Sequence, residues 1–235
     1  MPATLILPSR FNGPDDSGNG GYTAGRIAQA LGGSDVEVRL LKPPPLQRQL
    51  QLNRQDDGMV SVKDGNTLIA SGKTRRVKMK PQDPVSFKQA EAAAKKYPGL
   101  KEHVFPRCFV CGTERSDGLG LHPGPVEGRP GVYACPWVPT EDLAGPGGEL
   151  RREFVWAALD CPAGWSTGIR EGNVAMLGTI AVRLLGAIRA GDEHVVMGWH
   201  RSTTDRKHQA ASAIYGPDGD ALAVSQSVWI TVSPK

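Results

Sequence analysis

The side chain best suited to catalysis is Asp160, which follows six consecutive apolar residues, Phe154 to Leu159. Consecutive helical positions point in all directions, so a helix of this composition is buried on every side. Burying an ionised carboxyl is costly unless hydrogen bonds or a ligand compensate. Two interpretations stay open. Asp160 is either a carboxylate kept for chemistry, or a structural residue that bonds the backbone near Pro162, where a helix must bend or stop.

Gly20 and Gly21 lie where a glycine-rich loop, Phe11 to Tyr22, leads into a predicted short helix, Thr23 to Leu31. Backbone N–H groups at the start of a helix are unpaired, and the helix dipole is positive there. Such a place binds an anion, or the negative oxygen that develops on a carbonyl under attack. The alternative is that the two glycines only permit a tight turn.

The four cysteines are Cys108, Cys111, Cys135 and Cys161. In a chain of 235 residues without a sign of export, we expect reduced thiols rather than a disulfide framework. The Cys108-x-x-Cys111 spacing also suggests zinc, with His122 and Cys135 as further ligands. A structural zinc site usually shows two tight pairs, and the second pair here is irregular. We therefore expect buried thiols or a turn, and no metal or other cofactor.

Composition sets the broad class. A hydrophobic content of 39% in 235 residues is enough for a real core. The net charge of +4 suits a polyanionic small molecule as easily as nucleic acid, and is too mild to decide between them. No apolar run is long enough to span a bilayer and no secretory signal is evident, so a cytoplasmic location is the default expectation. We expect neither a nucleic-acid nor a membrane partner.

The elements that must position these groups form two similar series. A short edge strand at Thr4 to Leu7 and the first helix precede four predicted strands, and the buried helix around Asp160 precedes four more. Short Asp-Gly turns recur at matching places: DGNTLIAS begins at Asp64 and DGDALAVS at Asp218, with four matches in eight. The shared order predicts a duplicated unit of one helix followed by an antiparallel meander.

The two units are joined by a segment with its own predicted helix, from near Pro84 to Pro98. Its lysine-rich outer face is typical of a linker helix on the surface. We expect a first half over residues 1–80, a linker over 81–106 and a second half over 107–235.

Three segments resemble the hotdog-fold thioesterases. Residues 108–125, CFVCGTERSDGLGLHPGP, are similar to a Cys-x-x-Cys-Gly segment with a later Gly-Leu in many such domains. Residues 153–165, EFVWAALDCPAGW, resemble the central helix of actinobacterial double-hotdog proteins. NGGY, from Asn19, resembles a His-Gly-Gly motif at the start of the hotdog helix, with Asn19 in place of the histidine.

The resemblance implies an α+β double hotdog: two helix-wrapped antiparallel β-sheet units in one chain, forming a pseudo-dimer. It also implies hydrolysis of an acyl thioester, usually of coenzyme A, without metal or cofactor. Such hydrolysis needs a carboxylate that activates water or attacks the carbonyl, and N–H donors for its oxygen. Asp160 with the Gly20 and Gly21 amides are the candidates. The resemblance adds Asn12 and Thr179 as assisting residues.

The resemblance also predicts one composite site per chain. In hotdog dimers of this type, the glycine pair of one subunit faces the acid of the other, about two helical turns along. Seven residues after Gly21 the first helix has Ala28 and no acid, and seven before Asp160 the second helix has Glu153 and no glycine pair. A non-catalytic acyl-binding protein is the main alternative. A hotdog dehydratase is less favoured, since neither helix contains histidine, and a homodimer is compatible with the sequence.

Overall fold

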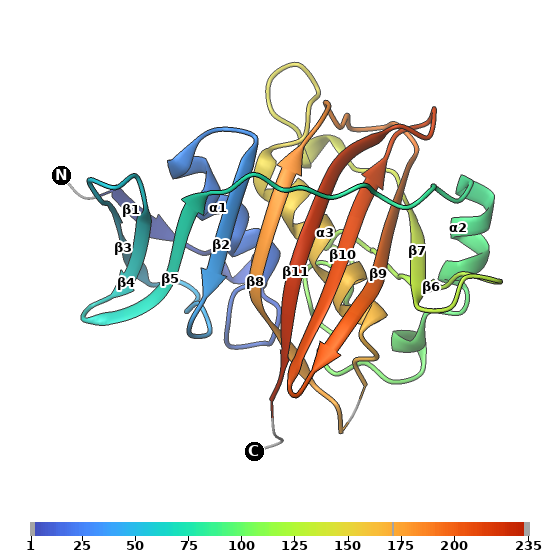
Figure 1. Ribbon diagram of the computed structural model, residues 1–235, viewed down its shortest axis with the longest axis horizontal. Helices are drawn as coiled ribbons and strands as arrows, with labels where there is room; N and C mark the ends of the chain where they lie inside the picture. Colours follow the sequence, from blue (N-terminus) through green and yellow to red (C-terminus); the bar gives the residue numbers. More distant parts are fainter. Residues whose placement is uncertain (1–2, 171, 233–235) are drawn as a thin grey trace.

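The computed structural model describes residues 3–170 and 172–232, which form one antiparallel sheet of eleven strands with two central helices on one of its faces (Figure 1). The helices are α1 (Gly20–Leu31), α2 (Phe87–Ala94) and α3 (Arg152–Ser166), with single 3-10 turns at Ser9–Phe11, Pro98–Leu100 and Glu141–Leu143. The strands are β1 (Ala3–Ile6), β2 (Asp35–Leu40), β3 (Gln49–Arg54), β4 (Val60–Asp64), β5 (Thr67–Thr74), β6 (Gly124–Pro125), β7 (Val132–Trp137), β8 (Ala175–Leu184), β9 (His194–Thr204), β10 (Lys207–Tyr215) and β11 (Ala221–Thr231). None of the helices within the described ranges has the length and hydropathy needed to cross a membrane.

The strand order shows two units of the same topology. It runs β1-β3-β4-β5-β2-β8-β11-β10-β9-β7-β6. In the first unit β2 pairs with β5 and β3 with β1, and in the second β8 pairs with β11 and β9 with β7. The units meet where β2 and β8 pair, with Val38 opposite Ile180. The predicted duplication is therefore visible in the topology, and the Asp64 and Asp218 turns lie in corresponding hairpins, β4–β5 and β10–β11.

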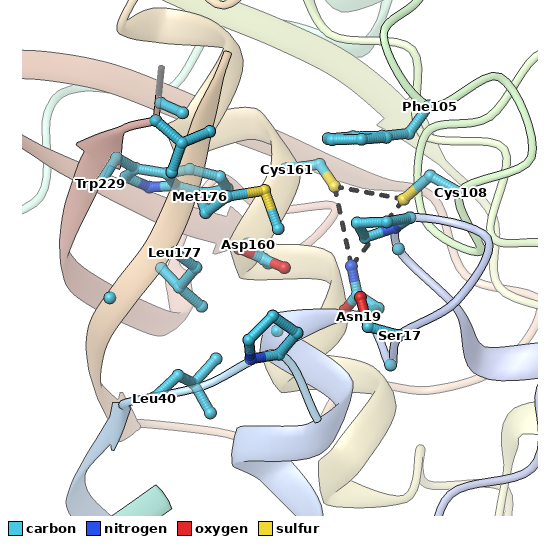
Figure 2. Close-up of a pocket in the computed structure, with 18 of the residues that line it drawn as sticks. Ser17, Asn19, Leu40, Phe105, Cys108, Asp160, Cys161, Met176, Leu177 and Trp229 are labelled. Carbon is cyan, nitrogen blue, oxygen red and sulfur yellow. Dashed lines mark hydrogen bonds between the residues drawn. The ribbon is translucent and has the colours of Figure 1, made fainter. Parts of the chain in front are cut away.

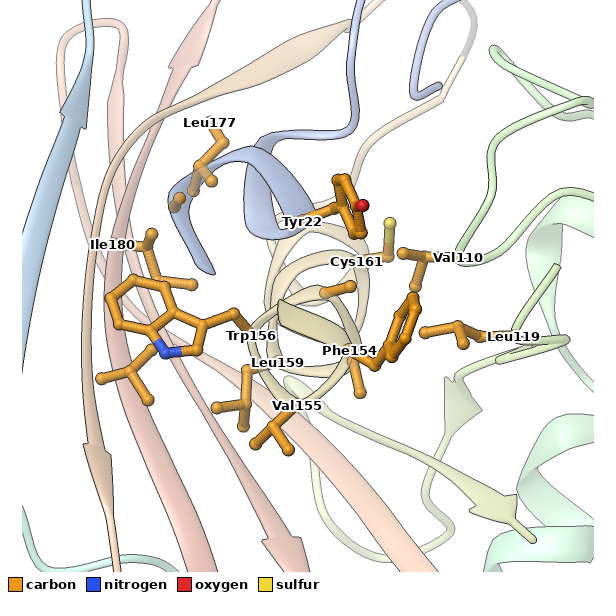
Figure 3. Packing of buried hydrophobic residues seen from close by; sticks show 14 of the residues in the cluster. Tyr22, Val110, Leu119, Phe154, Val155, Trp156, Leu159, Cys161, Leu177 and Ile180 are labelled. Carbon is orange, nitrogen blue, oxygen red and sulfur yellow. The ribbon is translucent and has the colours of Figure 1, made fainter. Parts of the chain in front are cut away.

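Helix α3 is buried on every side, as its apolar run predicts. Every residue of α3 from Glu153 to Ser166 is buried. Trp156 and Leu159 point towards the sheet (Figure 3). Phe154 points the opposite way, towards the segment that contains Val110 (Figure 3). The sheet and this segment together enclose the helix, and this enclosure explains how six consecutive apolar positions are all satisfied.

The helix does not stop at Pro162, one of the two outcomes expected there, because α3 continues through this residue to Ser166. The packing of β9 accounts for it. A Cβ atom at Gly198 would lie 2.1 Å from the Pro162 carbonyl oxygen, so the β9 backbone lies directly against the helix at this point. We infer that this close packing offsets the backbone hydrogen bond that proline cannot donate.

Helix α1 starts at Gly20, three residues before the predicted start, because the Asn19 side chain accepts a hydrogen bond from the Tyr22 N–H and caps it. The backbones of α1 and α3 approach each other very closely where the two helices cross. A Cβ at Gly21 would lie 2.6 Å from the Cβ of Asp160, and one at Gly25 would lie 2.6 Å from the Cα of Glu153. Glycines four residues apart thus form the face of α1 that lets the two backbones approach.

The segment between β5 and α2 crosses the opposite face of the sheet, over the strands of the second unit (Figure 1). Val77 and Val85 of this segment are buried in a second apolar cluster that also contains Tyr215. Helix α2 begins later than predicted, after a capping box at Ser86, and it packs on β7. Lys88 within it and Lys95 and Lys96 directly after it are exposed. The joining segment therefore covers the outer face of the second unit.

Strand β7 was not predicted from the sequence, since it is short and contains Pro136. Pro136 pairs with Val195 of β9 on one side. On the other side β6 pairs only with Tyr133 and Ala134, so the missing N–H of Pro136 faces no strand there.

Candidate functional site

A pocket of about 270 Å³ lies where the N-terminal end of α1 meets α3, and strands of both units contribute to its wall (Figure 2). Its wall is mostly apolar and includes Leu40, Pro44, Phe105, Trp165, Met176, Leu177 and Trp229. The polar side chains that line it are few: Asp160, Asn19, Ser17, Lys42, His103 and the thiols of Cys108, Cys111 and Cys161. A pocket of this composition suits an apolar ligand with one polar, reactive group.

The carboxyl of Asp160 lines this pocket and is only 2% exposed. Its Oδ2 accepts a hydrogen bond from the Gly21 N–H at 2.8 Å. Its Oδ1 has no hydrogen-bond partner within the described chain. Burial raises the pKa of Asp160 from 3.8 to about 7, against the opposing effect of the Gly21 N–H. A carboxyl with this pKa and a free oxygen can take up a proton near neutral pH.

The two glycines at the start of α1 have different partners. The Gly21 N–H holds Asp160, whereas the Gly20 N–H has no partner among the residues that the structure describes. Gly20 lines the pocket, and a Cβ there would lie 2.8 Å from Cδ2 of Leu177. The structure thus brings Asp160, Gly20 and Gly21 together from opposite units, with one unpaired amide at a helix N-terminus beside the carboxyl.

Asn19 stands where the resembled motif has histidine. Its Oδ1 accepts the Tyr22 N–H at 2.9 Å, so its NH₂ group is turned to the other side. That group lies 3.9 Å from Sγ of Cys108 and 4.0 Å from Sγ of Cys161 (Figure 2). Asn19 therefore caps the helix and faces the sulfurs at the pocket wall.

Asn12, one of the two assisting residues that the resemblance implied, lies outside the pocket wall. Its Oδ1 accepts a hydrogen bond from Arg115 at 2.8 Å, and its amide donates to the Gly13 carbonyl at 3.2 Å. These bonds hold the loop before α1, in a separate polar cavity that Arg107 and Asp117 also line.

Thr179, the other implied residue, also lies outside the pocket wall. It is opposite Val228 of β11, whereas the next pair is Leu177 with Trp229, so Gly178 is an extra residue in β8. Ile180 is fully buried in the core on the helix side, and Thr179 therefore faces the other side of the sheet.

The thiols of Cys108, Cys111 and Cys161 converge at the pocket, with their sulfurs within 4.8 Å of one another. The pKa of the Cys108 thiol lies well below its usual range, because the neighbouring Cys111 and Cys161 thiols stabilise its charged form. Cys135 is elsewhere and donates to the Val196 carbonyl. His122, the other zinc ligand considered from the sequence, stacks on the Tyr97 ring with centroids 5.2 Å apart.

Cys161 is the member of this thiol cluster that the sequence reasoning missed. It lies 50 residues after Cys111, so no spacing rule connects the two. The one feature of the sequence that could have indicated Cys161 is its position directly after Asp160, because residues next to Asp160 are also expected to line a pocket there.

Comparison with known proteins gives no match in sequence and many in structure. No protein-family profile matches the chain, and neither does a curated protein. Among solved structures, the chain is similar to the TesB protein of Mycobacterium avium subspecies paratuberculosis, with a TM-score of 0.64 and 12% identity over 97% of this chain and 92% of that one. It is also similar to the acyl-CoA thioesterase II TesB2 of Mycobacterium marinum, with a TM-score of 0.63 and 13% identity over 99% and 93%.

A third structure carries the name of the fold. A conserved protein of unknown function with a hotdog fold, from Alicyclobacillus acidocaldarius, matches with a TM-score of 0.53 and 9% identity over 99% of this chain and 93% of that one. At such identities the likeness shows the fold alone. The predicted α+β hotdog fold, and the resemblance to hotdog-fold thioesterases at the level of fold, are confirmed.

Proposed function

We propose that this chain is a thioester hydrolase that acts on an acyl-CoA, in the pocket between α1 and α3. The observation that carries the proposal is that a buried carboxyl with a free oxygen and an unpaired helix N-terminal amide line one apolar pocket. Two of the solved structures with the same fold are named as TesB proteins, one of them an acyl-CoA thioesterase. That likeness supports the choice of reaction.

In this mechanism the apolar wall holds the acyl chain, and the thioester carbonyl oxygen accepts a hydrogen bond from the Gly20 N–H. Asp160 takes a proton from water through Oδ1 as the water oxygen attacks the carbonyl carbon. The Gly20 amide stabilises the negative oxygen of the tetrahedral intermediate. When the intermediate collapses, the carbon–sulfur bond breaks and the thiol leaves with the proton from Asp160. One water is consumed, and one carboxylic acid and one thiol are formed.

The proposal is tested by incubating the purified chain with a panel of acyl-CoAs and following release of free thiol. We expect turnover of at least one member, with preference set by the fit of the acyl group to the apolar wall. Tight binding of acyl-CoAs without thiol release across the panel would contradict it.

The alternative is a non-catalytic acyl-binding protein. Asn19 favours this alternative, because its side chain caps helix α1 at the position where the resembled motif has a histidine. The same panel separates the two functions, since a binding protein would change no thioester.

We further propose that each chain has one composite site, with donors from α1 and the acid from α3. At the corresponding place on the other side of the helix crossing, Glu153 is bonded by the Gln29 side chain. Glu153 is also absent from the wall of the pocket. The expected result is one equivalent of a non-hydrolysable acyl-CoA analogue bound per chain in calorimetric titration, and two equivalents would rule out the single site.

The division into a first half (1–80), a linker (81–106) and a second half (107–235) remains our proposal, together with a cytoplasmic location. The topology supports the division, because β1 to β5 lie in the first half and β7 to β11 in the second.

A further inference from the structure

Three buried thiols meet at the pocket wall, and they come from two separate parts of the chain. Cys108 and Cys111 belong to the segment that encloses α3, and Cys161 belongs to α3 itself. All three side chains are buried, and all line the pocket beside Asn19. Neither the helix cap nor the hydrolytic mechanism accounts for this convergence.

The segment around Cys108 and Cys111 is shaped as a tight turn. The Cys108 N–H donates to the Phe105 carbonyl at 2.9 Å, and the Gly112 N–H donates to the Cys108 carbonyl at 2.8 Å. A Cβ at Gly112 would lie 2.5 Å from the Pro106 carbonyl oxygen, so the turn requires glycine there. This turn brings the sulfurs of Cys108 and Cys111 close together, and the sulfur of Cys161 lies next to them.

We propose that Cys108, Cys111 and Cys161 bind one thiophilic divalent ion of the zinc class. In a tetrahedral site with Zn–S distances of about 2.3 Å, two sulfurs lie about 3.8 Å apart. The sulfurs of Cys108 and Cys161 lie 3.8 Å apart, and all three are within 4.8 Å of one another. Small movements of side chains would bring the third sulfur to the same spacing.

The surroundings of the three sulfurs fit bound thiolates. The NH₂ group of Asn19 faces the sulfurs of Cys108 and Cys161, because its oxygen is held by the Tyr22 N–H. N–H donors next to thiolate ligands orient them and lower their charge density. The fourth position of the ion would face the pocket, where water can supply the remaining ligand.

This ligand set differs from the one considered from the sequence. The irregular second pair, His122 with Cys135, argued against metal, and neither residue belongs to the cluster: His122 Nε2 lies 3.5 Å from the Gly112 carbonyl oxygen, and the Cys135 thiol donates to the Val196 carbonyl. Cys161 takes their place. An ion bound there would join the segment before β6 to α3, and would fix the pocket wall that Phe105 forms.

The experiment is a titration of the full chain, after removal of metal with a chelator, with Zn²⁺ and with Co²⁺. We expect one equivalent to bind, release of protons from the thiols, and for Co²⁺ the absorption of thiolate ligands in near-tetrahedral geometry. Cys161→Ser should weaken binding by at least about 100-fold, a loss beyond that of outer-shell partners. Cys135→Ser, which removes a buried thiol outside the cluster, should bind as the unaltered chain does.

Failure of the unaltered chain to bind one equivalent with this cobalt spectrum would overturn the proposal. Undiminished affinity in a folded Cys161→Ser variant would also overturn it. If Cys161→Ser does not fold, Cys111→Ser takes its place, since it removes a ligand from the turn and leaves α3 intact.

Discussion

Replacing Asp160 with asparagine is expected to lower the rate of thioester hydrolysis by about 10²- to 10⁴-fold, the range that a general base contributes. The amide has the shape of the carboxyl, and its oxygen can still accept the Gly21 N–H, but it cannot take a proton from water. Folding and ligand binding should persist. The measurements are thiol release from the best acyl-CoA and calorimetric affinity for its non-hydrolysable analogue.

The stability of the Asp160→Asn variant provides a second check. The pKa of Asp160 is raised from 3.8 to about 7 in the folded chain, so the folded state holds a proton that the unfolded chain releases. The contribution of Asp160 to the free energy of unfolding therefore falls as pH rises between these two values, and is lowest above pH 7. Asparagine removes this loss, so the variant should gain melting temperature relative to wild type across that window.

Glu153→Gln is the matched control. Glu153 is the other buried carboxylate of α3, seven residues earlier, and lies outside the pocket wall with Gln29 as its partner. We expect near-wild-type hydrolysis from this variant. Full activity of Asp160→Asn, or a large loss in Glu153→Gln with an intact fold, would refute the assignment of the acid.

Substituting alanine for Gly21 or Gly25 is expected to destabilise the chain by about 1–3 kcal/mol, the usual cost of overpacking. In an open helix the same change would stabilise by about 0.5–1 kcal/mol. Here the added methyl at Gly21 would overlap the Trp156 carbonyl oxygen, at 2.6 Å, and the one at Gly25 would overlap the Glu153 backbone. Because backbone atoms cannot rotate away, the two helices must separate. Thermal and urea unfolding measure the effect.

Gly145→Ala is the control for the glycine substitutions. A Cβ there would be 3.8 Å from its nearest neighbours, an ordinary contact distance. Its effect on the free energy of unfolding should stay within about 0.5 kcal/mol. Equal stability of all three variants would show that the close helix crossing is not required.

Much of the fold could be predicted because its signals are local. Period-two runs and Asp-Gly turns predicted the meanders, and the six apolar residues before Asp160 predicted a helix enclosed on every side. The start of α1 was placed three residues late, since the capping bond of Asn19 depends on side-chain geometry. That α3 does not stop at Pro162 could not be predicted, because β9, which packs against the helix there, lies more than 30 residues later in the chain.

The candidate site was predictable only in part, for a related reason. Gly20, Gly21 and Asp160 could be predicted, because residue type and position along a helix are enough to indicate what they could do chemically. The face of the sheet on which the Thr179 side chain lies depends on a single extra residue in β8. Alternation counted from Leu177 would place Thr179 on the pocket side, and the bulge at Gly178 reverses it. The thiol cluster needed tertiary structure, because Cys161 reaches Cys108 across more than 50 residues.

The hydrogen bond between Gly21 and Asp160 closes a loop of 139 residues. Contacts of such long sequence separation form late, since the entropy of closing the chain must be offset by structure already in place. Neither unit alone contains both groups, so the proposed catalytic pair exists only after the two units have docked along β2 and β8. During synthesis the growing chain has Gly20 and Gly21 long before Asp160, and the second unit must be complete before activity can appear.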